Sequence, residues 1–183
     1  TAIDMPAGPS EALVIADESA IPQYVAADLL AQAEHGVDSQ SVLVTTSAEL
    51  AGKVQTELAK QLPVLPRAEI AGKAMDNSYI VLVNNLDEAM DFSNQYAPEH
   101  LILATANWKL ITPGIINAGS VFLGNLTPES AGDYASGTNH TLPTSAYARA
   151  TSGVSVDSFV KKITFQHLTP EGIKNIGPTE IGR

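Results

Sequence analysis

The sequence predicts an α/β fold in which a mostly parallel sheet is flanked by helices. Two observations support this class. Several short segments are uninterrupted apolar runs, which is typical of strands buried on both faces of a sheet. These runs alternate with longer stretches of helical periodicity, and such alternation indicates strands joined through helices that cover the sheet.

The predicted elements follow one another without a long internal repeat. Strands are expected at residues 12–16, 41–46, 79–83, 101–104 and 119–123. Helices are expected at residues 21–35, 47–61, 68–75 and 86–95, with a short helical stretch around Trp108. Residues 1–154 are therefore predicted to form one α/β domain, an incomplete Rossmann-like layer. Residues 155–183, with a helix expected at 170–175, are predicted to form a small C-terminal appendage.

Local signals set the limits of the first two helices. Val25, Leu29 and Ala33 recur at i, i+4 and i+8 as an apolar stripe. Gly36 then supplies the residue type that helices favour just past their end. Pro63 ends the second helix, because proline lacks a backbone donor and clashes with the preceding turn.

Composition excludes several classes of partner and site. The chain has 183 residues, of which 44% are hydrophobic and 16% charged, as expected for a globular protein with a real core. Its formal charge of -10 disfavours nucleic acid and anionic membranes as partners. It has no cysteine, so any metal must be held by His, Asp, Glu or amide oxygens. Without a signal peptide or an apolar spanning stretch, a cytoplasmic location is expected. Because the chain opens at Thr1 without an initiating methionine, it is predicted to be a fragment of a longer protein.

Gln32 and His35 are the first candidate ligand pair. They stand three residues apart at the last turn of the first predicted helix, so both side chains can leave the same face. That spacing suits a metal site. The alternative is that Gln32 is a surface residue and that His35 is a C-terminal helix residue whose positive form suits the helix dipole.

Glu99 and His100 are the candidate acid and base pair. They are adjacent where the chain leaves a helix and enters a strand. A carboxylate beside an imidazole can supply two proton-transfer groups of different strength. A capping carboxylate and a histidine packed at a strand end would explain the same residues without chemistry.

Residues 128–140 are the third candidate region, because they are rich in small and polar residues and carry Asp133 and His140. We expect a binding loop there rather than a helix or strand. His167 alternates within the 163–168 segment and is interpreted as structural. Ligands of parallel sheets bind beyond the carboxyl ends of strands, so we expect the candidate residues to gather at that edge, in loops such as 98–100 and 126–137.

Four blocks, in this order along the chain, carry a close resemblance to the histidinol dehydrogenase family. They are Pro6 to Glu11, Asp28 to Gly36, Asn94 to Leu101, and Ala118 to His140. The resemblance implies the oxidation of L-histidinol to L-histidine through the aldehyde, with two NAD and a zinc ion, as the last steps of histidine biosynthesis.

The resemblance also implies a role for individual residues. The zinc ligands fall on Gln32, His35 and Asp133, and the acid and base pair falls on Glu99 and His100. His100 is then the recurrent proton acceptor, and Glu99 activates a water molecule between the two oxidations. The residues implied in substrate binding are Ser10, Gln32, His35, His100, Asp133 and His140.

Departures from the family pattern limit what this chain can do alone. Family members are more than twice as long, and the region with most of the nicotinamide contacts precedes the matched part. The family is a homodimer in which a carboxyl-terminal tail from the partner subunit supplies a further zinc ligand, and Arg183 ends the chain before that tail. The isolated chain is therefore expected to be inactive. Two alternatives remain, a non-catalytic metal- or small-ligand-binding module and a zinc hydrolase with Glu99 as its base.

Overall fold

The computed structural model describes residues 5–6 and 8–180, and it confirms the α/β class. Five parallel strands form one sheet in the order β3-β2-β1-β4-β5. The strands are β1 Glu11–Ala16, β2 Gln40–Thr45, β3 Tyr79–Leu82, β4 His100–Ala104 and β5 Ser120–Leu123. All five were expected within a residue or two of these limits.

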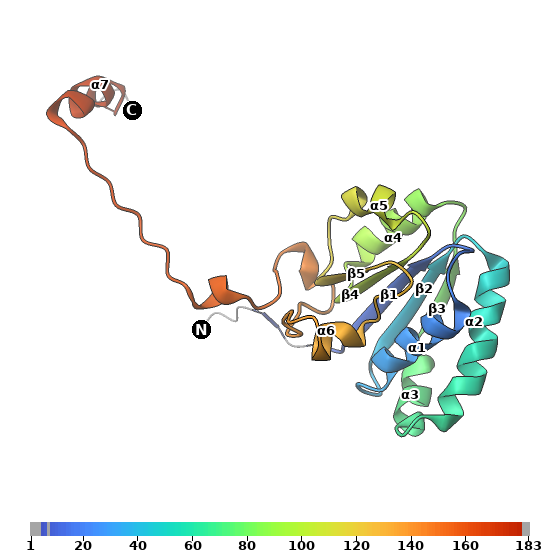
Figure 1. The fold of residues 1–183 in the computed structure, drawn as a ribbon. Coiled ribbons are helices and arrows are strands. Elements are labelled where there is room, and N and C mark those ends of the chain that lie inside the picture. Colours follow the sequence, from blue (N-terminus) through green and yellow to red (C-terminus); the bar gives the residue numbers. More distant parts are fainter. Residues whose placement is uncertain (1–4, 7, 181–183) are drawn as a thin grey trace.

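Helices cover both faces of the sheet (Figure 1). The α-helices are α1 Pro22–Ala33, α2 Ala48–Gln61, α3 Ala68–Met75, α4 Leu86–Tyr96, α5 Trp108–Ile111, α6 Ser130–Tyr134 and α7 Pro170–Glu180. Short 3-10 turns are Leu62–Val64, Thr112–Gly114, Tyr147–Arg149 and Val156–Phe159. No helix in the described part of the chain is long and apolar enough to cross a membrane.

The core lies in two apolar layers, one on each face of the sheet. On one face, Val14 and Ile102 of the central strands pack with Leu29 of α1 and Val54 of α2. On the other face, residues such as Ile15 pack against α4 and α5. The central strands β1 and β4 are fully buried, which explains why they appear in the sequence as continuous apolar runs.

Side-chain caps begin two of the helices. The Ser47 hydroxyl accepts the Leu50 N–H at the start of α2, and the Asn85 side chain accepts the Glu88 N–H at the start of α4. Helix α4 ends at Tyr96 and is capped by Ala97, which has a φ of 56°. This left-handed residue turns the chain sharply, so that β4 begins only a few residues later.

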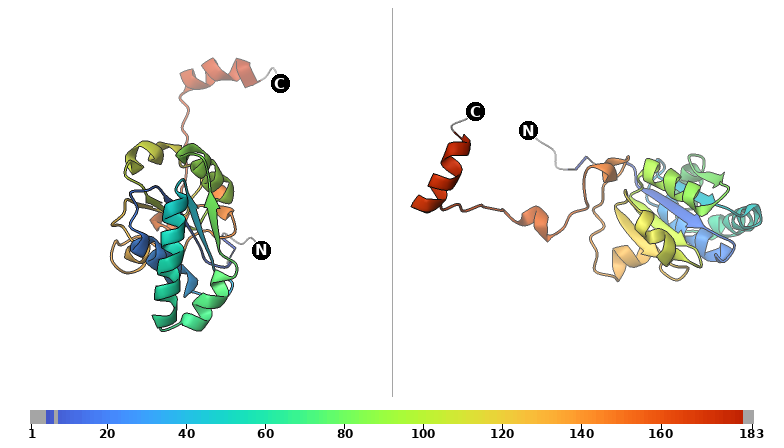
Figure 2. Two further views of the ribbon diagram at one scale, coloured as in Figure 1. Left: turned by 90° about the vertical axis from the view of Figure 1, so that its right-hand side faces the viewer. Right: turned by 90° about the horizontal axis from the view of Figure 1, so that it is seen from above.

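The segment from about residue 155 onward leaves the sheet as an extended arm that ends in α7 (Figures 1 and 2). Large apolar side chains along it are exposed to solvent, for example Val156 at 80%, Phe159 at 83% and Phe165 at 91%. Helix α7 extends to Glu180, five residues beyond the predicted end. Such a run of exposed apolar side chains is unusual on a monomer.

Candidate functional site

The site is built around the first residues of β1 and β4, which are neighbouring strands. His100 is the first residue of β4 and lies opposite Ala12 of β1. The turn at Ala97 places Glu99 just before the strand, and Ser10 lies just before β1. Residues far apart in the sequence therefore meet at the amino end of the sheet.

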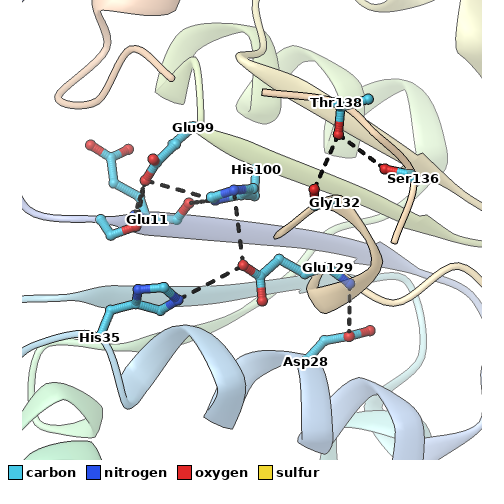
Figure 3. Close-up of polar contacts among 10 residues, drawn as sticks. Glu11, Asp28, His35, Glu99, His100, Glu129, Gly132, Ser136 and Thr138 are labelled. Carbon is cyan, nitrogen blue, oxygen red and sulfur yellow. Dashed lines mark hydrogen bonds and ion pairs between the residues drawn. The ribbon is translucent and has the colours of Figure 1, made fainter. Parts of the chain in front are cut away.

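Glu99 is held firmly at this end of the sheet. Its side-chain oxygen Oε2 accepts a 2.6 Å hydrogen bond from the Ser10 hydroxyl and a 3.0 Å bond from the Glu11 N–H. Glu99 is only 5% exposed, and these two donors offset the cost of burying its charge. The carboxylate thus has a fixed orientation beside His100 (Figure 3).

His100 is oriented by a contact with the backbone of β1. Its Nδ1 lies 3.3 Å from the Glu11 carbonyl oxygen and 3.7 Å from Glu99 Oε2. A carbonyl can only accept, so Nδ1 carries the hydrogen, and Nε2 of the neutral ring is left as an acceptor. Burial lowers the pKa of His100, although the Glu99 carboxylate opposes this shift. A neutral, oriented imidazole is suited to accept a proton.

His35, Glu129 and Asp133 form a group that can hold a metal ion. One ligand atom from each lies within 4.8 Å of the others. Gln32, in the last turn of α1, has a fully buried side chain, and neither of its amide atoms has a hydrogen-bond partner among the described residues. An orphaned amide is costly in a folded protein, and a bound cation would supply its oxygen with a partner.

Glu129 lies at the centre of the site. Its side chain is 1% exposed, with Oε1 at 3.9 Å from His100 Nε2 and 4.0 Å from His35 Nε2. Burial, and after it the nearby carboxylates of Asp133, Asp28 and Glu99, raise the pKa of Glu129 to about 7. Several acidic groups therefore converge on one buried space, which favours a cationic ligand.

Hydrogen bonds to Glu11 and to the backbone of Glu129 hold the residues next to the site in place. The Ser145 N–H donates to Glu11 Oε1, and burial raises the pKa of Glu11. The Asp28 carboxylate accepts a 3.2 Å hydrogen bond from the Glu129 N–H. Burial raises the pKa of Asp28 to about 6, against the effect of that bond. Glu129 is thereby tied to the middle of α1.

The location of the site corrects one expectation. The candidate residues were expected beyond the carboxyl ends of the strands. Glu99 and His100 instead precede or begin β4, and Ser10 precedes β1, so they lie at the amino end. His35 follows α1, which runs back from the carboxyl end to the amino end of the sheet. The rule for open parallel sheets is not followed here, because the chain after β5 returns to the amino end and brings Glu129 and Asp133 with it.

The 128–140 region also differs from its expected form. Helix α6 lies within it and carries Asp133, so the region is not entirely a loop. Gly132 packs so tightly that an added Cβ would lie 2.9 Å from the Phe122 ring. His140 lies in the exposed stretch after α6, and the structure shows it in no polar contact with the other candidates among the described residues. His167 is exposed on the arm.

Glu129 is the site residue that sequence reasoning missed. A signal was available, because Glu129 and Asp133 stand four residues apart and would share one face of a helix. That relation was hidden by the interpretation of the region as a loop. Glu11 and Asp28 were missed as well, since nothing local distinguishes a buried carboxylate from an exposed one.

Comparisons with known proteins agree with the geometry. The histidinol dehydrogenase family model matches residues 1–181. The chain is 64% identical over 177 residues to histidinol dehydrogenase of Bacteroides thetaiotaomicron, covering 97% of this chain and 41% of that protein. It is 59% identical over 178 residues to the chloroplastic histidinol dehydrogenase of Arabidopsis thaliana, covering 96% of this chain and 38% of that protein.

A solved structure shares the fold closely. The crystal structure of histidinol dehydrogenase from Elizabethkingia anophelis superposes with a TM-score of 0.95 at 59% identity, over 97% of this chain and 41% of that one. The chain thus spans about two fifths of the length of its relatives. The match of the family model over nearly every residue, joined to this structural likeness, shows that the chain belongs to the histidinol dehydrogenase family.

Proposed function

We propose that this chain forms the metal and proton-transfer part of an enzyme that oxidises L-histidinol to L-histidine through L-histidinaldehyde, with two NAD, in the last steps of histidine biosynthesis. The observation that carries the proposal is the meeting of a neutral, oriented His100 with the group His35, Glu129 and Asp133 in one buried space. A proton acceptor beside a metal site is suited to the oxidation of an amino alcohol. The metal can bind the nitrogen atoms of the substrate, and the base can take the hydroxyl proton.

Zinc is the metal that we propose for this site. Gln32, His35 and Asp133 would hold it, because amide oxygen, imidazole nitrogen and carboxylate oxygen are all zinc donors. The orphaned amide of Gln32 and the close approach of His35 and Asp133 support this set. Bound zinc would supply a Lewis acid that anchors and orients the nitrogen atoms of the substrate.

His100 is proposed as the proton acceptor in both oxidations. As hydride leaves the carbinol carbon for NAD, the hydroxyl proton must go to a base, and Nε2 of His100 faces the buried space. Its Nδ1–H bond to Glu11 fixes the ring throughout. The residues that contact NAD are not assigned within this chain.

Glu99 is proposed to activate the water that adds to the aldehyde between the two oxidations. Its anchored oxygen already accepts two hydrogen bonds, so the carboxylate is oriented before a water molecule arrives. Ser10, which donates one of these bonds, is proposed both to orient Glu99 and to contact the substrate. His140 is proposed as a further substrate contact, carried on the segment that follows α6.

A homodimer is the proposed assembly. The exposed apolar residues of the arm, which include Phe159 and Phe165, would be covered by a second subunit. Such an arm fits the tail exchange that the family resemblance implies, and we propose that residues 155–183 act as a unit separate from the α/β domain. Because the relative from Arabidopsis thaliana is chloroplastic, a cytoplasmic location stays a prediction from the sequence.

The test uses the natural gene product that contains this sequence, purified with zinc. We expect L-histidinol to drive the reduction of two NAD per molecule, and removal of zinc by a chelator to abolish it, with recovery on adding zinc back. Binding of L-histidinol without any NADH would identify the non-catalytic binding module instead. Hydrolysis of an ester or amide without NAD would identify the hydrolase.

A further inference from the structure

The Glu129 side chain has no hydrogen-bond donor for Oε1 within the described part of the chain, although it is almost completely buried. Burying a carboxylate oxygen without a partner is unfavourable, so such a group points to a missing ligand atom. The backbone of Glu129 is well anchored. Its N–H donates to Asp28, and its carbonyl accepts the Gly132 N–H at 2.9 Å.

The distances around Oε1 leave room for one further atom. His35 Nε2 lies at 4.0 Å and His100 Nε2 at 3.9 Å, both too long for a direct hydrogen bond. Figure 3 shows Glu129 between the two imidazoles, with its carboxylate turned toward both. A ligand atom placed between these groups would lie within reach of the carboxylate.

The chemistry of the facing groups specifies that atom. His100 Nε2 is an acceptor, because Nδ1 carries the hydrogen, and the carboxylate of Glu129 is also an acceptor. Two acceptors that face one another repel unless a donor lies between them. The surrounding carboxylates of Asp133, Asp28 and Glu99 favour a donor that is positive or strongly polarised. An amino group satisfies both conditions; a metal ion bound by Glu129 is the competing occupant, because Glu129 belongs to the group that can hold one, and the zinc content of the variants tells the two apart.

We propose that Glu129 binds the amino group of the substrate. This inference rests on the proposed function, since L-histidinol carries its amino group on the carbon between the imidazole-bearing arm and the carbinol carbon. If the imidazole ring lies toward His35 and the carbinol toward His100, the amino group on the carbon between them falls midway, where Glu129 Oε1 lies and where it can also reach the zinc site. Glu129 would then discriminate amino alcohols from alcohols that lack the amine.

The experiment compares two ligands on the zinc-loaded, full-length enzyme without NAD. L-histidinol is compared with imidazolepropanol, which is L-histidinol without its amino group, and affinities are measured by calorimetry. For E129Q we expect binding of L-histidinol to weaken about 10- to 100-fold, as for the loss of a charge-assisted hydrogen bond. Binding of imidazolepropanol is expected to change less than about threefold. Zinc content should be unchanged.

Two further variants keep the test decisive. Glu129→Asp retains the charge but withdraws it by one methylene, so it should show the same preference in weaker form, and it replaces E129Q if that variant does not fold. Glu88→Gln, at an exposed carboxylate on α4, should leave both affinities unchanged.

The outcomes separate this inference from the proposed function. If E129Q weakens both ligands equally, or loses its zinc, Glu129 acts on the metal or the fold and the inference is wrong, while oxidation of L-histidinol by the unmodified enzyme would still support the function. If the unmodified enzyme neither binds nor oxidises L-histidinol, the proposed function fails and this inference fails with it.

Discussion

At the carboxyl end of the sheet, the buried carboxylate of Asp17 has donors for both oxygens, whereas at the amino end Glu129 Oε1 has none among the residues that the structure describes. Asp17 follows β1 and accepts hydrogen bonds from the Ser19 N–H at 3.0 Å, the Ser19 hydroxyl and the Ala106 N–H at 3.1 Å. It joins the chain after β1 to the chain after β4, at the position where open sheets usually bind ligands. The buried carboxylate at that position is therefore satisfied by groups of the chain itself.

The amino end shows the opposite condition. Within residues 5–6 and 8–180, the buried amide of Gln32 and one oxygen of Glu129 lack partners there, and several carboxylates share the space. At the carboxyl end only single oxygens, on Thr105 and Asn125, are unpartnered among the described residues. Buried polar atoms without partners, and carboxylates gathered in one space, thus locate the site better than strand topology does.

The largest effect is expected from His100→Asn in the full-length enzyme. Loss of the proton acceptor should lower the turnover of both oxidation steps by about 10² to 10⁴-fold. Oxidation of L-histidinol and of the aldehyde can be followed separately through NADH. Asp17→Asn is the matched change at the other end, and it should lower stability while turnover stays within about threefold. A comparable loss of turnover in both variants would contradict the contrast between the two ends.

Glu99→Gln should give a smaller and more selective loss. If Glu99 activates water, oxidation of the aldehyde should fall by about 10²-fold, while the first oxidation falls far less. Ser10→Ala removes the 2.6 Å bond that orients Glu99, so it should show the same pattern more weakly. Equal losses in the two steps would assign Glu99 a general structural role instead.

Gly119→Ala tests the backbone of the amino end. An added Cβ would lie 2.6 Å from the Glu99 carbonyl oxygen, which cannot move without displacing Glu99 and His100. We expect a loss of about 2 to 4 kcal/mol in the free energy of unfolding, measured by urea denaturation. Gly52→Ala, in α2, is the control, since apart from the neighbouring helix backbone no atom lies within 4 Å of its added Cβ, and it should stabilise by about 0.5 to 1 kcal/mol. Destabilisation by both changes would show that the close approach at Gly119 is not the cause.

The sequence specified the sheet and most helices because their signals are local. Apolar runs marked β1 and β4, and the stripe Val25, Leu29 and Ala33 marked α1. Local patterns singled out the pairs Gln32 with His35 and Glu99 with His100 as candidates. The family resemblance added Ser10 and implied a role for each residue. The position of the site at the amino end was missed, since it depends on where the chain travels after β5. Glu129 was missed because its position is set by distant contacts, such as the hydrogen bond from its N–H to Asp28, which is 101 residues away in the sequence. Helix α6 is short and made of small and polar residues, so packing rather than propensity forms it.

The smallest effect concerns Asp28, a second buried aspartate that contrasts with Asp17. In the described part of the chain the Asp28 carboxylate has one donor, the Glu129 N–H, and burial raises its pKa to about 6 from a usual value of 3.8. As pH rises from about 4 to 6, the unfolded chain loses this proton before the folded chain does, so the carboxyl group lowers stability across that window. Above about pH 6 the loss of stability that this carboxyl group causes is constant.

Asp28→Asn keeps an acceptor for the Glu129 N–H and removes the group that gains and loses the proton. Its free energy of unfolding, relative to the unmodified protein, should therefore rise by about 1 to 2 kcal/mol between pH 4 and 6 and then level off. Asp91→Asn, at an exposed position on α4, should give a difference that does not change with pH. A flat difference for the D28N variant would mean that Asp28 is already ionised in the folded protein at pH 4, so that burial at the amino end costs it nothing.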